Sequence, residues 1–192
     1  MKGDAMDVRT AIEKRRAFRA LERFDATDDI IAELAGAARL AASCFNNQPW
    51  RFVFVTGPDI LERMHEALSR GNEWARKASM IIAAFGKKDD DCLIKEREYY
   101  LFDIGMAVSA MVLRATEMGL VAHPIAGYSP SRAKEILGIP EDRMLITLVI
   151  VGKKSENIEG LTDAQKIAEA ERPARRDPAA IYSVDRYDPR LE

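Results

Sequence analysis

The chain has 192 residues, of which 47% are hydrophobic and 31% are charged, so a single domain with a substantial core is expected. The formal net charge is −2 and acids are interspersed with bases, which gives no reason to expect a nucleic-acid surface or a polybasic membrane patch. The first residues lack the apolar segment of a signal peptide, and no later stretch is long enough to span a membrane. A cytoplasmic protein is therefore expected.

The few metal-binding side chains do not form a zinc motif. Cys44, Cys92, His65 and His123 lie too far apart in the sequence for any standard zinc spacing. The two cysteines are expected to be free thiols in a reducing cytosol, with a disulfide as the less favoured alternative. The acidic run 89–91 predicts a solvated turn rather than a metal site, because three adjacent side chains do not easily converge on one ion.

The first predicted element is a helix from Asp7 to about Arg16, with the acid as its N-cap. Its end is strongly basic, since Lys14, Arg15 and Arg16 are followed by Arg19. Basic side chains at a helix C-terminus interact favourably with the helix dipole, which is a sufficient structural reason for some of them. The same guanidinium groups could instead bind a phosphate through paired hydrogen bonds.

Apolar spacing predicts most of the remaining elements. A second helix is expected over 30–42 and a long, largely apolar helix over 96–118. The other expected elements are a buried strand over 51–56, a helix from Gly57 to Leu68, a second strand over 80–85, an extended segment over 120–125, a short helix that ends at Leu137 and a third strand over 145–151.

A polar loop connects the second helix to the first strand. Ser43, Asn46, Asn47 and Gln48 place short hydrogen-bonding side chains in a row, and Pro49 then prevents a helix and sets the entry into the strand. Such a loop either faces a ligand or is a solvated connection.

From residue 153 onward the composition turns to charge, proline and alanine, apart from a helix expected over 162–171. We therefore expect one domain over residues 1–152 and a C-terminal extension of the same domain over 153–192. An extension of this length is expected to lie across its own domain or across a partner subunit.

Several catalytic motifs are absent. No two glycines stand one residue apart, so no dinucleotide-binding fingerprint can be drawn, and the sequence contains neither a phosphate-binding loop nor a Gly-x-Ser-x-Gly elbow. Two histidines leave little scope for a catalytic triad. A chain with few catalytic side chains can still be an enzyme if a bound cofactor carries the reaction.

Four motifs in order give the chain a resemblance to the FMN-dependent nitroreductase family over about residues 8–152. They are Arg15-Arg16-Ala17-Phe18-Arg19, Ser43-Cys44-Phe45-Asn46-Asn47-Gln48-Pro49-Trp50, Asp103-Ile104-Gly105 and Pro124-Ile125-Ala126-Gly127-Tyr128, with a weaker echo at Arg175-Arg176-Asp177-Pro178. The resemblance implies an α+β fold with a central sheet flanked by helices. It also implies an intertwined homodimer that binds two FMN molecules at the subunit interface and whose C-terminal extension embraces the neighbour.

The resemblance also implies which residues bind the cofactor. Arginines near the N-terminus hold the phosphate, the ribityl chain and the pyrimidine side, and a tail arginine approaches the phosphate. The polar loop reaches the cofactor from the other subunit, and backbone groups after the long helix lie at the flavin N5 and O4 edge. The implied FMN-binding residues are Arg15, Arg16, Ala17, Arg19, Ala42, Ser43, Cys44, Asn46, Pro124, Ile125, Ala126, Gly127 and Arg176, with Asn72 as a further expected ring contact.

Two positions depart from the family pattern. Ala17 stands where the family usually has a hydroxyl residue, which removes one phosphate ligand, and Ala42 stands where it usually has proline, which loosens the loop. Both changes bear on how strongly FMN is bound.

The implied activity is hydride transfer from NADH or NADPH to FMN and then to a nitroaromatic, a quinone or a similar small acceptor, with no catalytic side chain required. The guanidinium of Arg19, fixed beside the flavin, favours the reduced state, which is anionic around N1 and O2. The short connection 87–99 favours an open, permissive site. The alternatives are a specialised flavin reaction, such as dehalogenation, ene reduction or flavin breakdown, and a non-catalytic flavin-binding dimer.

Overall fold

The core of the protein is one antiparallel sheet, seen in a computed structural model that describes residues 6–191. Residues 1–5, where the sequence predicted only the absence of an apolar leader, lie outside the described part. The sheet has the order β1-β7-β3-β2, and β6 also pairs with β7. Its strands are β1 (Leu21–Glu22), β2 (Arg51–Val55), β3 (Met80–Gly86), β6 (Val121–Ile125) and β7 (Met144–Lys154).

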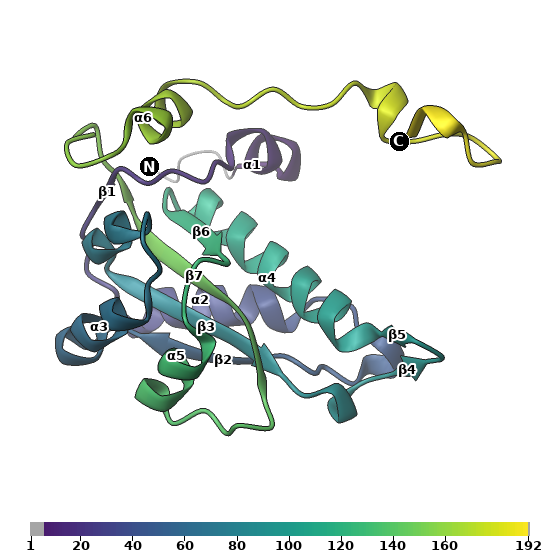
Figure 1. Ribbon diagram of the computed structural model, residues 1–192, viewed down its shortest axis with the longest axis horizontal. Coiled ribbons are helices and arrows are strands. Elements are labelled where there is room, and N and C mark those ends of the chain that lie inside the picture. The colour runs from purple at the N-terminus through teal and green to yellow at the C-terminus, as the bar shows by residue number, and fades with distance from the viewer. Residues whose placement is uncertain (1–5, 192) are drawn as a thin grey trace.

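Helices surround this sheet, and a small hairpin precedes the longest of them (Figure 1). The α-helices are α1 (Val8–Lys14), α2 (Asp28–Arg39), α3 (Pro58–Met64), α4 (Tyr99–Glu117), α5 (Pro130–Leu137) and α6 (Asp163–Ala170). The hairpin consists of β4 (Leu93–Ile94) and β5 (Arg97–Glu98). Short 3₁₀ turns are η1 (Cys44–Asn46), η2 (His65–Ala67), η3 (Glu73–Lys77), η4 (Lys88–Asp90), η5 (Pro178–Ala180) and η6 (Pro189–Leu191).

Both faces of the sheet are buried, and alternate residues of each strand point to opposite faces. On β3, Ile81 and Ala83 join one apolar cluster, with side chains of α3 and α5. Met80, Ile82 and Ala84 join the other cluster, with α2 and α4. Burial on both sides explains why the strands read as nearly continuous apolar runs in the sequence.

The long helix α4 is buried over much of its surface, as its composition predicts. It packs against α1, α2, β3 and β6. Its one fully buried charged residue is Asp103, whose side chain is 2% exposed. None of the helices in residues 6–191 combines the length and apolar character needed to cross a bilayer.

The C-terminal extension divides into two parts. β7 continues through Lys153 and Lys154, which pair with β1, and so the strand passes the boundary proposed at residue 152. The chain then returns over the N-terminal segment as α6, which begins with a capping box formed by Thr162 and Gln165. Beyond α6 the chain runs away from the body of the protein (Figure 1).

Chain order and element types agree with the sequence-based prediction of an α+β fold. The two-residue strand β1 and the hairpin β4-β5 were not predicted, because segments this short carry no readable periodicity. The bounds of the predicted elements shift by a few residues, mostly at helix ends.

We expect Gly86→Ala to lower the free energy of unfolding by about 1–3 kcal/mol, because overpacking forces a core to rearrange. A Cβ at Gly86 would lie 2.5 Å from Cδ1 of Ile104 and 2.9 Å from the carbonyl oxygen of Pro49. Gly36→Ala, in the middle of α2 with no atom within 4 Å of the new Cβ, is the matched control and should stabilise by about 0.5–1 kcal/mol. Urea denaturation of both variants checks this, and equal stabilities would contradict it.

Candidate functional site

The arginines near the N-terminus line a pocket of about 190 Å³. Its walls come from the segment between α1 and β1 on one side, and from the end of α6 and the residues that follow it on the other. The predicted residues Arg15, Arg16, Ala17 and Arg19 are all present. The remaining lining residues are Ala168, Arg172, Pro173 and Arg175.

Hydrogen bonds fix the end of α6 against this segment. Nη2 of Arg16 donates to the carbonyl oxygens of Ala168 at 2.6 Å and Glu169 at 3.1 Å, so a cation caps the negative end of the helix. The backbone N–H of Arg19 donates to Oε1 of Glu169 at 2.6 Å. Arg172 donates to the carbonyl oxygen of Arg15 at 3.0 Å. The first part of the C-terminal extension therefore closes the pocket within one protomer.

The pocket is strongly positive. Among the described residues, no ion pair joins Arg15, Arg16, Arg19, Arg172 or Arg175 to a carboxylate. Burial lowers the pKa of Arg15, and the charges of Arg172 and Arg175 lower it further. A bound anion would relieve this mutual repulsion.

A buried carboxylate oxygen lies close to the same segment. Glu169 is 8% exposed, and its Oε2 has no hydrogen-bond partner although Oε1 accepts from Arg19. A buried acceptor without a partner is unfavourable, so a ligand that carries hydroxyl groups would satisfy it.

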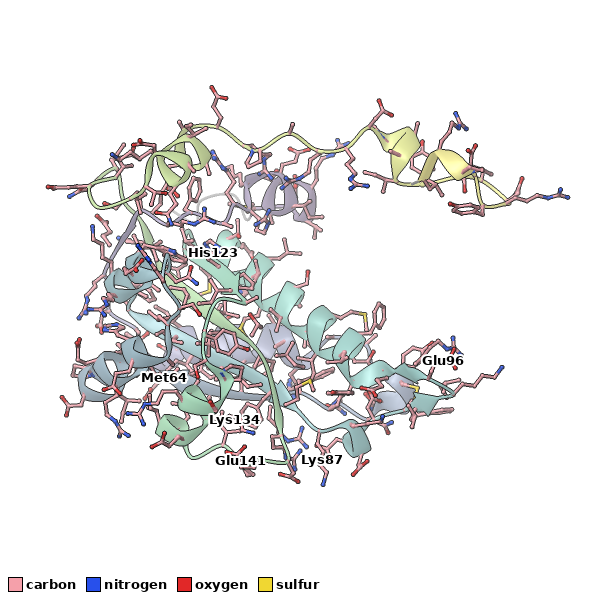
Figure 2. All side chains as sticks on the ribbon, viewed as in Figure 1. Met64, Lys87, Glu96, His123, Lys134 and Glu141 are labelled. Carbon is pink, nitrogen blue, oxygen red and sulfur yellow. A yellow bond between two sulfur atoms is a disulfide. The ribbon has the colours of Figure 1, made fainter. Side chains whose placement is uncertain are left out.

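An aromatic pair lies beside the arginine segment, where Figure 2 shows His123 on the side of the sheet that faces α6. The rings of His123 and Trp74 stack with their centres 4.7 Å apart, and the guanidinium of Arg19 lies 5.9 Å from the centre of the Trp74 ring. Nδ1 of His123 is 3.0 Å from the carbonyl oxygen of Phe18, so the neutral ring donates there. Neither aromatic was predicted as part of a site.

The loop after β6 is tied to the same aromatic group. Nε1 of Trp74 donates to Oδ1 of Asn72 at 3.2 Å, and Nδ2 of Asn72 donates to the carbonyl oxygen of Gly127 at 2.8 Å. A Cβ at Gly127 would lie 2.4 Å from that Nδ2 atom, so only glycine allows this approach. The predicted residues Ala126 and Gly127 thus adjoin the arginine segment through Asn72 and Trp74, and Pro124 and Ile125 precede them in β6.

The predicted residues Ala42, Ser43, Cys44 and Asn46 lie elsewhere in the protomer. The backbone N–H of Cys44 donates to Oδ2 of Asp103 in the second turn of α4, at 2.7 Å. This loop therefore adjoins the end of α4 that carries the hairpin β4-β5, and Figure 1 shows that end on the opposite side of the molecule from α6. One protomer does not bring the two sets of residues together.

The expectation of free thiols was wrong, because Cys44 and Cys92 form a disulfide. The two residues are 48 positions apart in the sequence, and their Cα atoms are 6.0 Å apart in the fold. They meet because the loop after α2 and the segment before β4 both lie at the start of α4. Sequence spacing alone contains no information about this contact.

The acidic run 89–91 forms a turn, as predicted, but the turn is not fully solvated, because Oδ2 of Asp91 is buried. Asp89 is paired with Lys87, and Asp90 with Arg143. In the described part of the chain, one group could geometrically hold a metal ion, namely Asp91 with Cys44 and Cys92. Its sulfurs are joined to each other and are therefore not thiolate ligands.

The structure adds site residues that sequence reasoning did not identify. Arg172 and Arg175 line the arginine pocket, whereas the predicted Arg176 is not among its lining residues. The signal available in the sequence was the cluster of arginines from 172 to 176, within which no pattern distinguishes the residues that face inward.

We expect stability to fall as the pH drops from about 6.5 to about 4, because burial lowers the pKa of His123 to about 4 and the unfolded chain then binds a proton that the folded chain excludes. Arg19 and Arg15 act in the same direction. His123→Asn should remove up to about 3 kcal/mol of this pH dependence. Urea denaturation from pH 4 to 8 measures it. His65→Asn is the comparison variant, and it should also remove part of the pH dependence, because burial lowers the pKa of His65 as well. Superimposable pH profiles of His123→Asn and the unchanged chain would contradict the assignment.

Comparison with known proteins identifies the family of the chain. The NADH dehydrogenase of Thermus thermophilus is 26% identical, and the match covers 79% of this chain and 88% of that protein. The oxygen-insensitive NADPH nitroreductase of Helicobacter pylori is 24% identical over 65% of this chain and 76% of that protein. A crystal structure described as an oxidoreductase containing FMN has a TM-score of 0.79 and 26% identity, and covers 98% of this chain and 99% of that chain. The model of the nitroreductase family matches residues 12–153, most of the chain, which therefore belongs to that family.

Proposed function

We propose that the chain acts as a homodimer that binds FMN at the subunit interface and transfers hydride from NADH or NADPH to a nitroaromatic, a quinone or a similar small acceptor. Family membership makes it an oxidoreductase, with FMN and NAD(P)H as its cofactors. The observation that carries the proposal is the arginine pocket between the N-terminal segment and α6.

The residues of this pocket fit FMN. Arg15, Arg16 and Arg19, with Arg172 and Arg175 opposite, offer guanidinium groups that can bind phosphate oxygens in pairs and keep their charge at any working pH. The phosphate dianion would offset the repulsion among these cations. The unpartnered Oε2 of Glu169 would suit a hydroxyl group of the ribityl chain, which is the second chemical feature of this cofactor.

FMN, when bound, accepts a hydride at N5 and passes it to an acceptor. The chain supplies binding, orientation and electrostatics for that chemistry. The guanidinium of Arg19 lies over Trp74, and Glu169 holds the backbone N–H of the same residue. A guanidinium placed beside the flavin would stabilise negative charge there. Burial lowers the pKa of His123 to about 4, so its ring is neutral at neutral pH and adds no positive charge beside Arg19.

The second protomer would complete the site. Ala42, Ser43, Cys44 and Asn46 lie at the other end of α4 from the arginine pocket, so they are proposed to reach the cofactor of the partner. Apolar residues in the extension are exposed, among them Ile181, Tyr182 and Val184, the last at 75%. Side chains of this kind are expected to be covered by a partner.

The cytoplasmic location stays a prediction.

The central test is whether the purified chain carries FMN and whether NADH or NADPH bleaches it in anaerobic stopped-flow mixing. We expect Arg19→Ala to raise the Kd for FMN about 10- to 100-fold, as lost charge-assisted hydrogen bonds do. Arg63→Ala, exposed on α3, is the control and should change nothing. In the same titration, Arg175→Ala should weaken binding more than Arg176→Ala. A colourless protein that takes up no FMN would overturn the proposal.

We expect the double substitution Ile181→Ser and Val184→Ser to raise the dissociation constant of the dimer tenfold or more, because each buried apolar side chain contributes about 1.5–3 kcal/mol. Sedimentation velocity over a range of concentrations measures this. Ile158→Ser, an exposed apolar residue that precedes α6, is the control. A monomer at all concentrations of the unchanged chain would show that the site is not shared.

A further inference from the structure

The loop after α2 has an unfavourable backbone conformation. Phe45, Asn46 and Gln48 have φ angles of 47°, 59° and 50°, in the left-handed region that side chains other than glycine rarely adopt. Asparagine tolerates this region, whereas phenylalanine and glutamine do so poorly. Three such residues within four positions require that the surrounding structure hold the loop in place.

Apolar packing does not hold it. No residue of η1 is buried, and the Phe45 side chain is 88% exposed. Hydrogen bonds contribute, since the N–H of Cys44 donates to Asp103 and the N–H of Gln48 donates to Oγ of Ser43 at 3.0 Å. Nδ2 of Asn47 also donates to Oδ1 of Asp91 at 3.2 Å. The disulfide from Cys44 to Cys92 is a covalent cross-link between this loop and the segment before β4.

The surroundings of the two sulfurs allow thiol exchange. Both cysteines are only partly buried. Nδ2 of Asn47 lies 3.6 Å from Sγ of Cys92 and would stabilise a thiolate there, which makes Cys92 the better leaving group. Two carboxylates, Asp91 and Asp103, also face the pair. Burial raises the pKa of Asp103, the hydrogen bond from the N–H of Cys44 acts against this, and Asp91 raises the pKa further.

We propose that the Cys44–Cys92 disulfide is a redox-active site, and that its reduction by a dithiol releases the loop and weakens FMN binding. The link to FMN rests on the proposed function, in which Ser43 and Asn46 contact the cofactor. Ser43 precedes Cys44 and Asn46 follows it by two positions, so breaking the disulfide releases the backbone that carries both residues.

The reaction is a two-electron exchange. A thiolate of the dithiol attacks Sγ of Cys44, the bond between the two cysteine sulfurs breaks, and Cys92 leaves as a thiolate that takes up a proton. The second thiol of the reductant then attacks the mixed disulfide and releases Cys44 as a thiol. The dithiol is oxidised to a disulfide, and both cysteines are reduced.

The test uses the full-length holoprotein before and after treatment with dithiothreitol. Alkylation and mass spectrometry should find Cys44 and Cys92 blocked before treatment and free after it. Hydrogen exchange should rise after reduction in residues 43–49. The Kd for FMN should rise about tenfold, which corresponds to a loop that keeps its present form about one tenth of the time.

Cys92→Ser is the matched variant, because Cys92 lies outside the proposed FMN contacts. It should bind FMN as weakly as the reduced chain and should not respond to dithiothreitol, which separates loop release from any action of the reductant on the flavin. Arg63→Ala should respond as the unchanged chain does.

Three results would count against the inference in different ways. Alkylation of both cysteines without reductant would overturn it, and so would equal FMN affinity of the oxidised and reduced chains. If neither state binds FMN, the proposed function and its link to the disulfide are both overturned. Hydrogen exchange in residues 43–49 then still decides whether the disulfide holds the loop.

Discussion

The pairing of β7 with strands on both sides is the constraint on which the rest of the structure depends. β7 pairs with β3 along one edge and with β6 and β1 along the other, so it fixes the register of the sheet. It also leads directly to α6, the helix whose last turn closes the arginine pocket. The same strand therefore organises the core and delivers the C-terminal extension to the N-terminal segment.

Sequence reasoning succeeded where a single element carries its own signal. The strands β3 and β7 and the helix α4 are long and apolar enough to be predicted from periodicity alone. The sequence allowed two interpretations of the arginines at the end of the first helix, as a phosphate site or as partners of the helix dipole. Arg16 does interact with a helix C-terminus, but that helix is α6 and not α1. Periodicity cannot show which distant helix a side chain will meet.

What could not be predicted depends on contacts between distant segments. The disulfide requires two loops to meet at the start of α4, and its sequence spacing gave no indication of that. Glu169 and Trp74 likewise read as an ordinary helical acid and an ordinary aromatic residue. They become part of a candidate site only because α6 and η3 pack beside the segment that carries Arg19.

The net charge of −2 gave no hint of the arginine pocket, because a total charge contains no information on where charges lie. Five arginines share one small pocket, while most acids of the chain pair with bases elsewhere or face solvent. This separation leaves a local positive field that the composition conceals. A single protomer offers that field at one end of α4 and the strained polar loop at the other. In the proposed homodimer, two copies packed antiparallel along this helix would place the arginine pocket of one protomer and the polar loop of the other around the same ligand. The anion would then both neutralise one protomer and fix the loop of its partner. Cofactor binding and assembly of the proposed dimer would therefore depend on each other.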